Sequence, residues 1–168
     1  MARRLRTLVA GASLVAAPLF VAAPAASAAP LPGGPYTYAA AHSGKCLEIE
    51  KGSLADGAPA IQRTCDGNTA QGWFNEKLDD GGILFRNQNS GQCLGVLGDS
   101  TAAGAQVVQQ SCQGRDSQRW FLINHGYGVY SFQNKKSQKC LSVRSASGSD
   151  GAAVVQAECD LANNQRWY

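Results

Sequence analysis

Residues 140–168 read CLSVRSASGSDGAAVVQAECDLANNQRWY, and their order of cysteines and closing Gln-x-Trp occurs twice more in the chain. Each position recurs at an offset of 47 residues, without a gap. The identical columns include Cys46, Cys93 and Cys140; Leu47, Leu94 and Leu141; Cys65, Cys112 and Cys159; Gln71, Gln118 and Gln165; and Trp73, Trp120 and Trp167. Self-similarity at one fixed period is typical of repeat architectures. The sequence therefore predicts three copies of one structural unit.

The units run 28–74, 75–121 and 122–168 when each ends with its Trp-Phe or Trp-Tyr pair. Within a unit, short apolar clusters alternate with Gly, Ser, Asn and Asp, which indicates strands and turns rather than amphipathic helices. In the third unit we expect strands at 129–133, 140–143 and 153–157, with a terminal strand at Trp167. A propeller needs about four to eight blades. Three units of four strands therefore favour a closed barrel with threefold symmetry.

The N-terminus has the pattern of a secretory signal peptide. Three arginines within the first six residues precede an apolar stretch, and Ala26-Ser27-Ala28 has the small-x-small form of a cleavage site. We expect residues 1–28 to be removed and residues 29–168 to be secreted to the extracellular space as one domain, with 29–35 as a flexible lead-in. A membrane anchor is the alternative, but Pro18 and Pro24 interrupt the stretch.

The charge balance argues against two classes of partner. The chain has 15 Lys and Arg and 12 Asp and Glu, a formal net charge of +3. Three of the basic residues lie in the expected signal peptide, so the expected mature domain is neutral. Binding to nucleic acid or to an anionic membrane depends on a basic surface. We therefore expect neither nucleic acid nor membrane as a partner.

Six cysteines in an exported domain predict a disulfide framework. Zinc is disfavoured because the chain has no Cys-x-x-Cys pair and only two histidines. The repeat symmetry leads us to expect one disulfide within each unit, and each would add about 3 kcal/mol by closing a loop of equal span. These are Cys46–Cys65, Cys93–Cys112 and Cys140–Cys159. A second symmetric pairing stays open, namely Cys65–Cys93, Cys112–Cys140 and Cys159–Cys46.

The three Cys-Leu pairs, each followed by a second cysteine and then by Gln-x-Trp, resemble the ricin-B type lectin repeat. The resemblance covers essentially the whole expected mature chain. It implies an all-β fold, the β-trefoil of three four-strand repeats. Members of this family are lectins and carbohydrate-binding modules, so the resemblance implies a saccharide or polysaccharide partner.

The resemblance also implies which positions contact sugar: an acidic residue two after the first cysteine, an aromatic residue two before the second, and an asparagine before the Gln of Gln-x-Trp. A carboxylate accepts bonds from sugar hydroxyls, an aromatic ring stacks on the apolar face of the sugar, and an amide fixes its orientation. The three units offer Glu48, Arg63 and Ala70; Gly95, Gln110 and Ser117; and Ser142, Ala157 and Asn164. The candidate binding residues are therefore Glu48, Asn164 and Gln165, in degenerate pockets.

Each candidate also has a simpler interpretation. Glu48 is typical of a solvated strand residue beside Glu50 and Lys51, and Asn164 of a turn residue. The repeated glutamines, Gln165 among them, occur even in the unit without a pocket, which favours an internal hydrogen bond. The repeated tryptophans are expected in the core. Tyr127 is a possible extra stacking platform, but packing over the barrel end is the simpler expectation.

Other functions find less support in the sequence. It has no nucleophile motif, metal-ligand spacing or phosphate-binding loop, so we expect no enzyme activity and no cofactor. The alternative to sugar binding is a trefoil that binds a protein, as an inhibitor or surface adaptor, after its sugar pockets decayed. A weaker option is an acidic glycan bound by four basic residues, Lys135, Lys136, Lys139 and Arg144.

Overall fold

The computed structural model describes residues 34–168. The expected signal peptide, 1–28, and most of the expected lead-in lie outside the described residues. Ten short strands make up the regular structure: β1 (Cys46–Ile49), β2 (Ala60–Arg63), β3 (Trp73–Lys77), β4 (Ile83–Asn87), β5 (Cys93–Val96), β6 (Val107–Gln110), β7 (Trp120–Asn124), β8 (Tyr130–Asn134), β9 (Cys140–Val143) and β10 (Ala152–Ala157). The strands recur with the 47-residue period of the sequence.

Two short 3₁₀ helices complete each repeat, one after its first hairpin strand and one before its tryptophan. They are η1 (Glu50–Gly52), η2 (Thr69–Gln71), η3 (Leu97–Asp99), η4 (Asp116–Gln118), η5 (Arg144–Ala146) and η6 (Asn163–Gln165). The expected strands of the third unit agree with β8, β9 and β10 to within one residue. The expected terminal strand is not assigned as one, because Trp167 makes only isolated bridges, to Ala40 and Tyr130.

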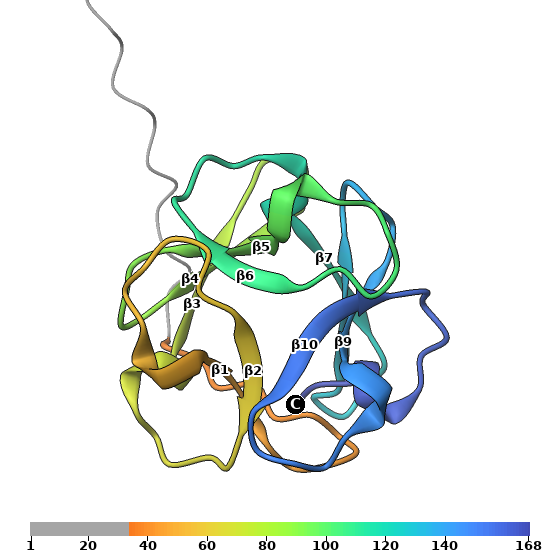
Figure 1. The fold of residues 1–168 in the computed structure, drawn as a ribbon. Helices are drawn as coiled ribbons and strands as arrows, with labels where there is room; N and C mark the ends of the chain where they lie inside the picture. Colours follow the sequence, from red (N-terminus) through yellow and green to blue (C-terminus); the bar gives the residue numbers. More distant parts are fainter. Residues whose placement is uncertain (1–33) are drawn as a thin grey trace, which may run out of the picture.

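The strands form a barrel and a layer of three hairpins around an approximate threefold axis (Figure 1). In the barrel, β3 pairs with β4, β4 with β7, and β7 with β8, and Trp167 closes the ring between Tyr130 and Ala40. The hairpins are β1–β2, β5–β6 and β9–β10. Contacts between β2 and β10, and bridges from Pro59 to Val108 and from Gln106 to Val155, join them. The expected threefold closed barrel is therefore confirmed.

The core repeats the same columns. Trp73, Trp120 and Trp167 are fully buried, and each indole N–H donates to the carbonyl of the leucine that follows the first cysteine of its repeat. The rings of Tyr38, Phe85 and Phe132 meet edge to face at centroid distances of 5.5, 5.2 and 4.8 Å. Because every repeat delivers a tryptophan and a second aromatic ring to the core, the packing explains why the tryptophan column is invariant and why the second column holds only Tyr or Phe.

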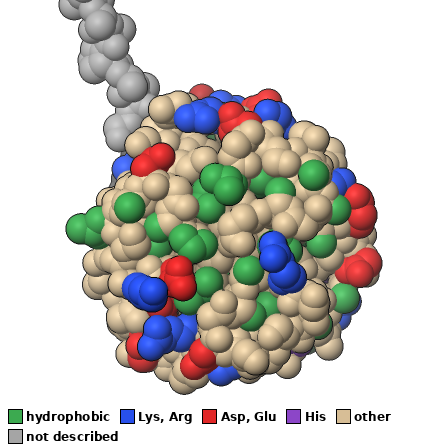
Figure 2. Space-filling model, viewed as in Figure 1, with side chains coloured by type: hydrophobic (Ala, Val, Ile, Leu, Met, Phe, Trp, Pro, Cys, Tyr) green, Lys and Arg blue, Asp and Glu red, His purple; other side chains and the backbone are tan. Residues whose placement is uncertain are grey.

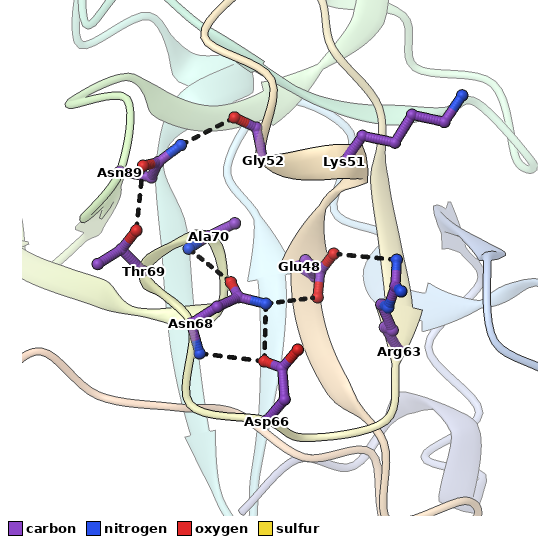
Figure 3. Close-up of a pocket in the computed structure, with 9 residues that line it drawn as sticks. All are labelled: Glu48, Lys51, Gly52, Arg63, Asp66, Asn68, Thr69, Ala70 and Asn89. Carbon is purple, nitrogen blue, oxygen red and sulfur yellow. Dashed lines mark hydrogen bonds and ion pairs between the residues drawn. The ribbon is translucent and has the colours of Figure 1, made fainter.

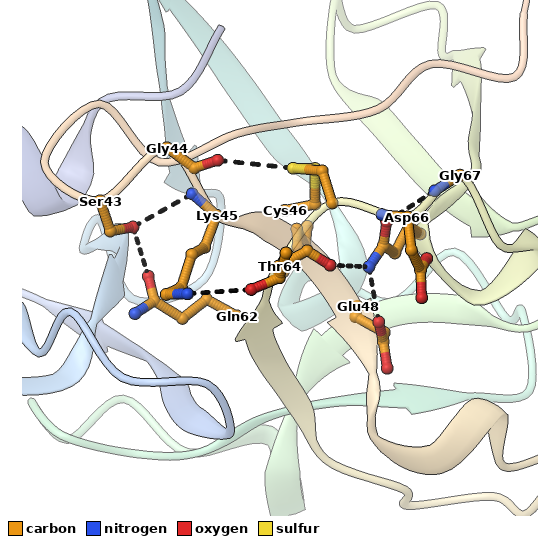
Figure 4. The surroundings of a disulfide bond; sticks show 12 residues. Ser43, Gly44, Lys45, Cys46, Glu48, Gln62, Thr64, Asp66 and Gly67 are labelled. Atoms are coloured by element: carbon orange, nitrogen blue, oxygen red, sulfur yellow. Dashed lines mark hydrogen bonds between the residues drawn. A yellow bond between two sulfur atoms is a disulfide. The ribbon is translucent and has the colours of Figure 1, made fainter.

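The disulfides join Cys46 to Cys65, Cys93 to Cys112 and Cys140 to Cys159. Each bridge fastens the open end of a hairpin to the loop that leads to the next 3₁₀ helix. The surroundings of the first are drawn in Figure 4, where Gly44 and Thr64 flank the bridge. The expected pairing within each repeat is confirmed, and the alternative pairing between repeats is excluded.

No helix among residues 34–168 is long and apolar enough to cross a membrane. Within the same residues, no group of His, Cys, Asp and Glu side chains is arranged to hold a metal ion. On the hairpin face, basic and acidic side chains are interspersed rather than gathered into one patch (Figure 2).

Candidate functional site

Each repeat brings its three candidate positions together in the same way. The position two after the first cysteine lies on the first hairpin strand, and the position two before the second cysteine lies on the paired strand. The 3₁₀ helix before the tryptophan packs against that first strand in all three repeats. The backbone therefore forms the same site in each of the three repeats, and the side chains determine whether each site is open.

In the first repeat this site is an open cleft of about 450 Å³ (Figure 3). Its size falls in the range of pockets that hold small ligands. Charged and amide side chains make up most of its lining, and no aromatic ring is among them. The lining residues are Glu48, Lys51, Gly52, Arg63, Asp66, Asn68, Thr69, Ala70 and Asn89.

Glu48 forms the floor of the cleft and is only 2% exposed. Its Oε2 accepts hydrogen bonds from Gln71 Nε2 at 2.7 Å and from Asn68 Nδ2 at 3.4 Å. Its Oε1 lies 4.0 Å from the guanidinium of Arg63. The interpretation of Glu48 as a solvated strand residue is therefore wrong: the carboxylate is buried, held on one oxygen and directed toward Arg63 with the other.

Asn68 supplies an amide that the sequence analysis missed. Its Oδ1 caps η2 by accepting from the backbone N–H groups of Ala70 at 2.8 Å and Gln71 at 3.2 Å. Its Nδ2 donates to Asp66 Oδ1 at 2.7 Å as well as to Glu48. The backbone and side-chain N–H groups of Asn68 hold the pKa of Asp66 below its usual range. An amide two residues before the expected position thus stands beside the carboxylate.

Comparison of the three repeats distinguishes Asn68 from the residues that the repeat conserves. The equivalent positions hold Arg115 and Ala162, so Asn68 falls outside every repeated column. Polar residues that occur in one repeat only, close to the Gln-x-Trp, are the ones that symmetry does not require.

The opposite wall of the cleft comes partly from the second repeat. Thr69 Oγ1 donates to Asn89 Oδ1 at 3.0 Å, and Asn89 Nδ2 donates to the carbonyl of Gly52 at 2.8 Å. Asn89 lies in the turn between β4 and β5. The first-repeat cleft is therefore bordered by two repeats, and its wall is fixed by hydrogen bonds.

The equivalent site in the second repeat is filled by its own side chains. A Cβ at Gly95 would lie 2.8 Å from Gln110 Oε1 and 2.9 Å from Gln118 Cγ. Ser117 donates from its hydroxyl to Asp99, and this hydrogen bond holds the pKa of Asp99 below its usual value. Gln110 and Gln118 therefore take up the space that a larger side chain at position 95 would need.

In the third repeat, Asn164 uses its amide within the protein. Its Nδ2 donates to Ser142 Oγ at 3.0 Å and to the carbonyl of Val143 at 2.9 Å. Gln165 accepts from the backbone N–H groups of Asp160 and Leu161 and donates to the carbonyl of Glu158 at 2.7 Å. The structure therefore does not bring these two residues together with Glu48, and their contact with sugar stays a prediction.

The remaining candidates lie elsewhere. The expectation that Tyr127 packs over the barrel end is wrong. Its side chain is fully exposed, and its backbone has a φ of 52° between two glycines. Of the four basic residues considered for an acidic glycan, Lys135 pairs with Asp80 and Asp116, and Lys139 pairs with Glu158. Much of that positive charge is therefore already balanced.

Comparisons with known proteins agree with this architecture. The family model for the ricin-type beta-trefoil lectin domain matches residues 36–167. A designed 3-fold symmetric protein, ThreeFoil, is 41% identical, with a TM-score of 0.77 over 79% of this chain and 94% of that one. The Rhizoctonia solani agglutinin, at 18% identity, has a TM-score of 0.73 over 82% of this chain and 94% of its own. The expected β-trefoil fold is confirmed.

An exo-beta-1,3-galactanase from Clostridium thermocellum also matches, at 29% identity and a TM-score of 0.77. The match covers 79% of this chain but only 29% of the galactanase. A search of curated protein sequences found no match.

Proposed function

Because the chain belongs to the family of ricin-type β-trefoil lectin domains, we propose that it is a carbohydrate-binding protein whose working site is the first-repeat cleft. The observation that carries this proposal is the buried carboxylate of Glu48. One of its oxygens is held by Gln71 and Asn68, while the other is directed toward Arg63 at the cleft. A carboxylate fixed in this way is preorganised to accept bonds from the hydroxyls of a sugar.

The chemistry of the lining favours recognition through hydroxyl groups. Glu48 and Asp66 supply acceptors, while Arg63 and Lys51 supply donors. Hydrogen bonds to charged groups contribute about 1.5–3 kcal/mol each. The lining has no aromatic ring to stack on a sugar, so we expect weak affinity that depends on these bonds.

The other two equivalent sites are proposed to be inactive toward sugar. Gln110 and Gln118 occupy the space at Gly95, and Asn164 uses its amide on Ser142 and Val143. We accordingly expect one saccharide bound in this set of sites. This expectation keeps Glu48 from our sequence candidates and differs from them in giving Asn164 and Gln165 structural roles.

The rest of the proposal follows from the sequence. The signal-peptide pattern of residues 1–28 supports secretion, and the lack of catalytic motifs supports a non-catalytic role. Likeness to part of a beta-1,3-galactanase makes β-1,3-galactan the first polysaccharide to test.

The test is calorimetric titration of the purified protein with β-1,3-galacto-oligosaccharides, xylo-oligosaccharides, chito-oligosaccharides and lactose. Glu48→Gln keeps the shape of the side chain and removes its charge, while Arg63→Gln changes a half-exposed side chain with little risk to folding. We expect each variant to weaken binding at least tenfold. Ser142→Ala, at the position of Glu48 in the third repeat, is the matched control and should bind normally. Unchanged affinity in both test variants would contradict the site.

A protein partner is the second candidate function. The absence of an aromatic ring from the first-repeat cleft favours it, as do two leucines, Leu54 and Leu97, that are 65% and 51% exposed. Leu54→Ser and Leu97→Ser should then abolish capture of a stoichiometric partner from culture supernatant. Saccharide binding lost in Glu48→Gln would instead favour the lectin function.

A further inference from the structure

A second pocket lies at the end of the barrel where β7 turns into β8, and it shares no residue with the first-repeat cleft. Its volume is about 480 Å³. Asn124 and Tyr130, which pair at that turn, form one side of it. The described residues that line it are Tyr36, Thr37, Tyr38, Asn75, Leu122, Asn124, Tyr130 and Tyr168.

The repeat symmetry does not produce this pocket. The position of Asn75 in β3 is occupied by Leu122 in β7, and Ile83 stands in the second repeat where the first and third have Tyr36 and Tyr130. Tyr168 occupies the position of Phe74 and Phe121 and adds a hydroxyl. At these positions the residue type changes from repeat to repeat, and tyrosine and asparagine occur where another repeat has an apolar residue.

The inner end of the pocket presents fixed polar atoms. The Tyr38 ring packs edge to face on Phe85 and Phe132, and its hydroxyl accepts a hydrogen bond from Asn75 Nδ2 at 2.6 Å. Burial raises the pKa of Tyr38 to about 12, so the hydroxyl keeps its proton and can donate. Asn75 Oδ1 is buried and has no hydrogen-bond partner among the described residues. The Tyr38 hydroxyl is therefore available as a donor at the inner end of the pocket. Asn75 Oδ1 lies buried beside it, and a buried acceptor without a partner is unfavourable until a ligand group reaches it.

The outer walls are aromatic and uncharged. Tyr36 and Tyr168 are 40% and 54% exposed, Leu122 is 41% exposed, and Tyr130 is half-buried. None of the described residues that line the pocket is charged, in contrast to the four charged residues that line the first-repeat cleft. Aromatic faces with a few placed amide and hydroxyl groups suit a neutral ring compound that carries both an apolar C–H face and hydroxyls.

We propose that this barrel-end pocket is a second saccharide site, which takes one neutral sugar residue stacked on the tyrosines with a hydroxyl hydrogen-bonded to Asn75 and Tyr38. The ligand class rests on the proposed function, but the site is independent of it. The pocket supplies the aromatic contact that the first-repeat cleft lacks. A protein with both sites would hold two sugar residues at once.

The experiment follows both sites in one titration by NMR. Methyl β-D-galactopyranoside, methyl β-D-xylopyranoside and N-acetylglucosamine are added to isotopically labelled protein with its three disulfides intact, and glucuronate is the charged comparison. The Asn75 side-chain amide and the ring signals of Tyr36 and Tyr168 report the barrel-end pocket, whereas the Asn68 side-chain amide reports the first-repeat cleft. We expect saturable shifts of the first set with at least one neutral sugar and none with glucuronate.

Two substitutions separate this site from the rest of the protein. Asn75→Leu introduces the residue of the equivalent position in β7, and Tyr168→Ala removes an exposed ring; each should weaken binding at the barrel end about tenfold. Tyr127→Ala removes another exposed tyrosine and is the control. Neither Asn75→Leu nor Tyr168→Ala should alter the shifts of Asn68, and Glu48→Gln should not alter those of Asn75.

The outcomes distinguish the two proposals. Shifts at Asn68 without shifts at Asn75 would overturn the barrel-end site and leave the first-repeat cleft in place. Shifts of the Tyr36 ring signals that disappear in Asn75→Leu but persist in Glu48→Gln would support the barrel-end site even if the cleft binds nothing. If the sugar-induced shifts of the Tyr36 ring survive both Asn75→Leu and Tyr168→Ala, the assigned contacts are wrong.

Discussion

At the scale of single residues, the repeated glutamines have an architectural role. Gln118 Oε1 accepts from the backbone N–H of Gln113 at 3.0 Å, and its Nε2 donates to the carbonyl of Ser111 at 2.9 Å. Gln71 and Gln165 make the equivalent pairs of bonds in their own repeats. The internal hydrogen bond expected from the sequence is confirmed, including in the repeat where no cleft is open.

We therefore predict that Gln118→Ala destabilises the protein without affecting saccharide binding. Two backbone groups lose their partner, but both are near the surface and water replaces part of the loss, so we expect a decrease of about 1–3 kcal/mol in the free energy of unfolding. Guanidinium denaturation monitored by tryptophan fluorescence measures it. Gln113→Ala, an exposed neighbour, should change stability by less than about 0.5 kcal/mol. Equal stability of the two variants would contradict this role.

Asp80 gives the clearest prediction of pH dependence. The hydrogen bond from Lys135, followed by those from Gly82 and Arg119, lowers the pKa of Asp80 to about 2. A carboxyl whose pKa is depressed on folding stabilises the protein above the pKa of its unfolded form, and that contribution is lost as the pH falls toward the folded value. Carboxyl ¹³C NMR should give a midpoint near 2.

The substitution Lys135→Met should move that midpoint upward, toward the ordinary value of 3.8. Lys136→Met changes an adjacent lysine that forms no ion pair with Asp80 and should leave the midpoint in place. A midpoint that does not respond to Lys135→Met would show that this lysine is not the main cause.

At the scale of elements, each hairpin is stabilised by one disulfide that closes the same span of 19 residues. Because the chain-entropy effect depends on that span, replacing any one of the three cysteine pairs by alanine should lower the free energy of unfolding by about 3 kcal/mol. Urea denaturation of the three double variants tests this. If only one of the three double variants lost stability, local packing rather than loop closure would determine the contribution of each disulfide.

The elements also show how far a sequence can predict such a protein. The 47-residue period predicts the strands because threefold closure requires similar core side chains at the same place in every repeat. The period leaves two symmetric disulfide pairings open, and the structure has the one within each repeat. The period carries no information on residues that break the symmetry. Glu48 is buried because Gln71 in η2 and Asn68 at its N-cap hydrogen-bond to its carboxylate. The polar sequence neighbours Glu50 and Lys51 led us to expect a solvated residue instead. Tyr127 points outward because its φ of 52° turns the chain between glycines.

At the scale of the whole molecule, the barrel closes between the first and third repeats. The N–H of Ala39 donates to the carbonyl of Tyr168 at 2.9 Å, and the N–H of Tyr168 donates back at 3.0 Å. Trp167 exchanges two backbone bonds of 2.8 Å with Tyr130. Each repeat shares its buried surface with its neighbours around the axis, so none has a complete core of its own.

Because the core is shared, we predict that a core substitution in one repeat destabilises all three. Trp167→Ala removes a fully buried side chain and should cost about 3–5 kcal/mol. Native-state hydrogen exchange should show the same loss of protection for the slowest amides of β5 and β6 in the second repeat as for those of β9 and β10, because the barrel opens as one cooperative unit. Trp120→Ala should give the same pattern. If Trp167→Ala lowers protection only in β9 and β10 while β5 and β6 remain unchanged, the repeats are separate folding units and closure of the ring adds little to their stability.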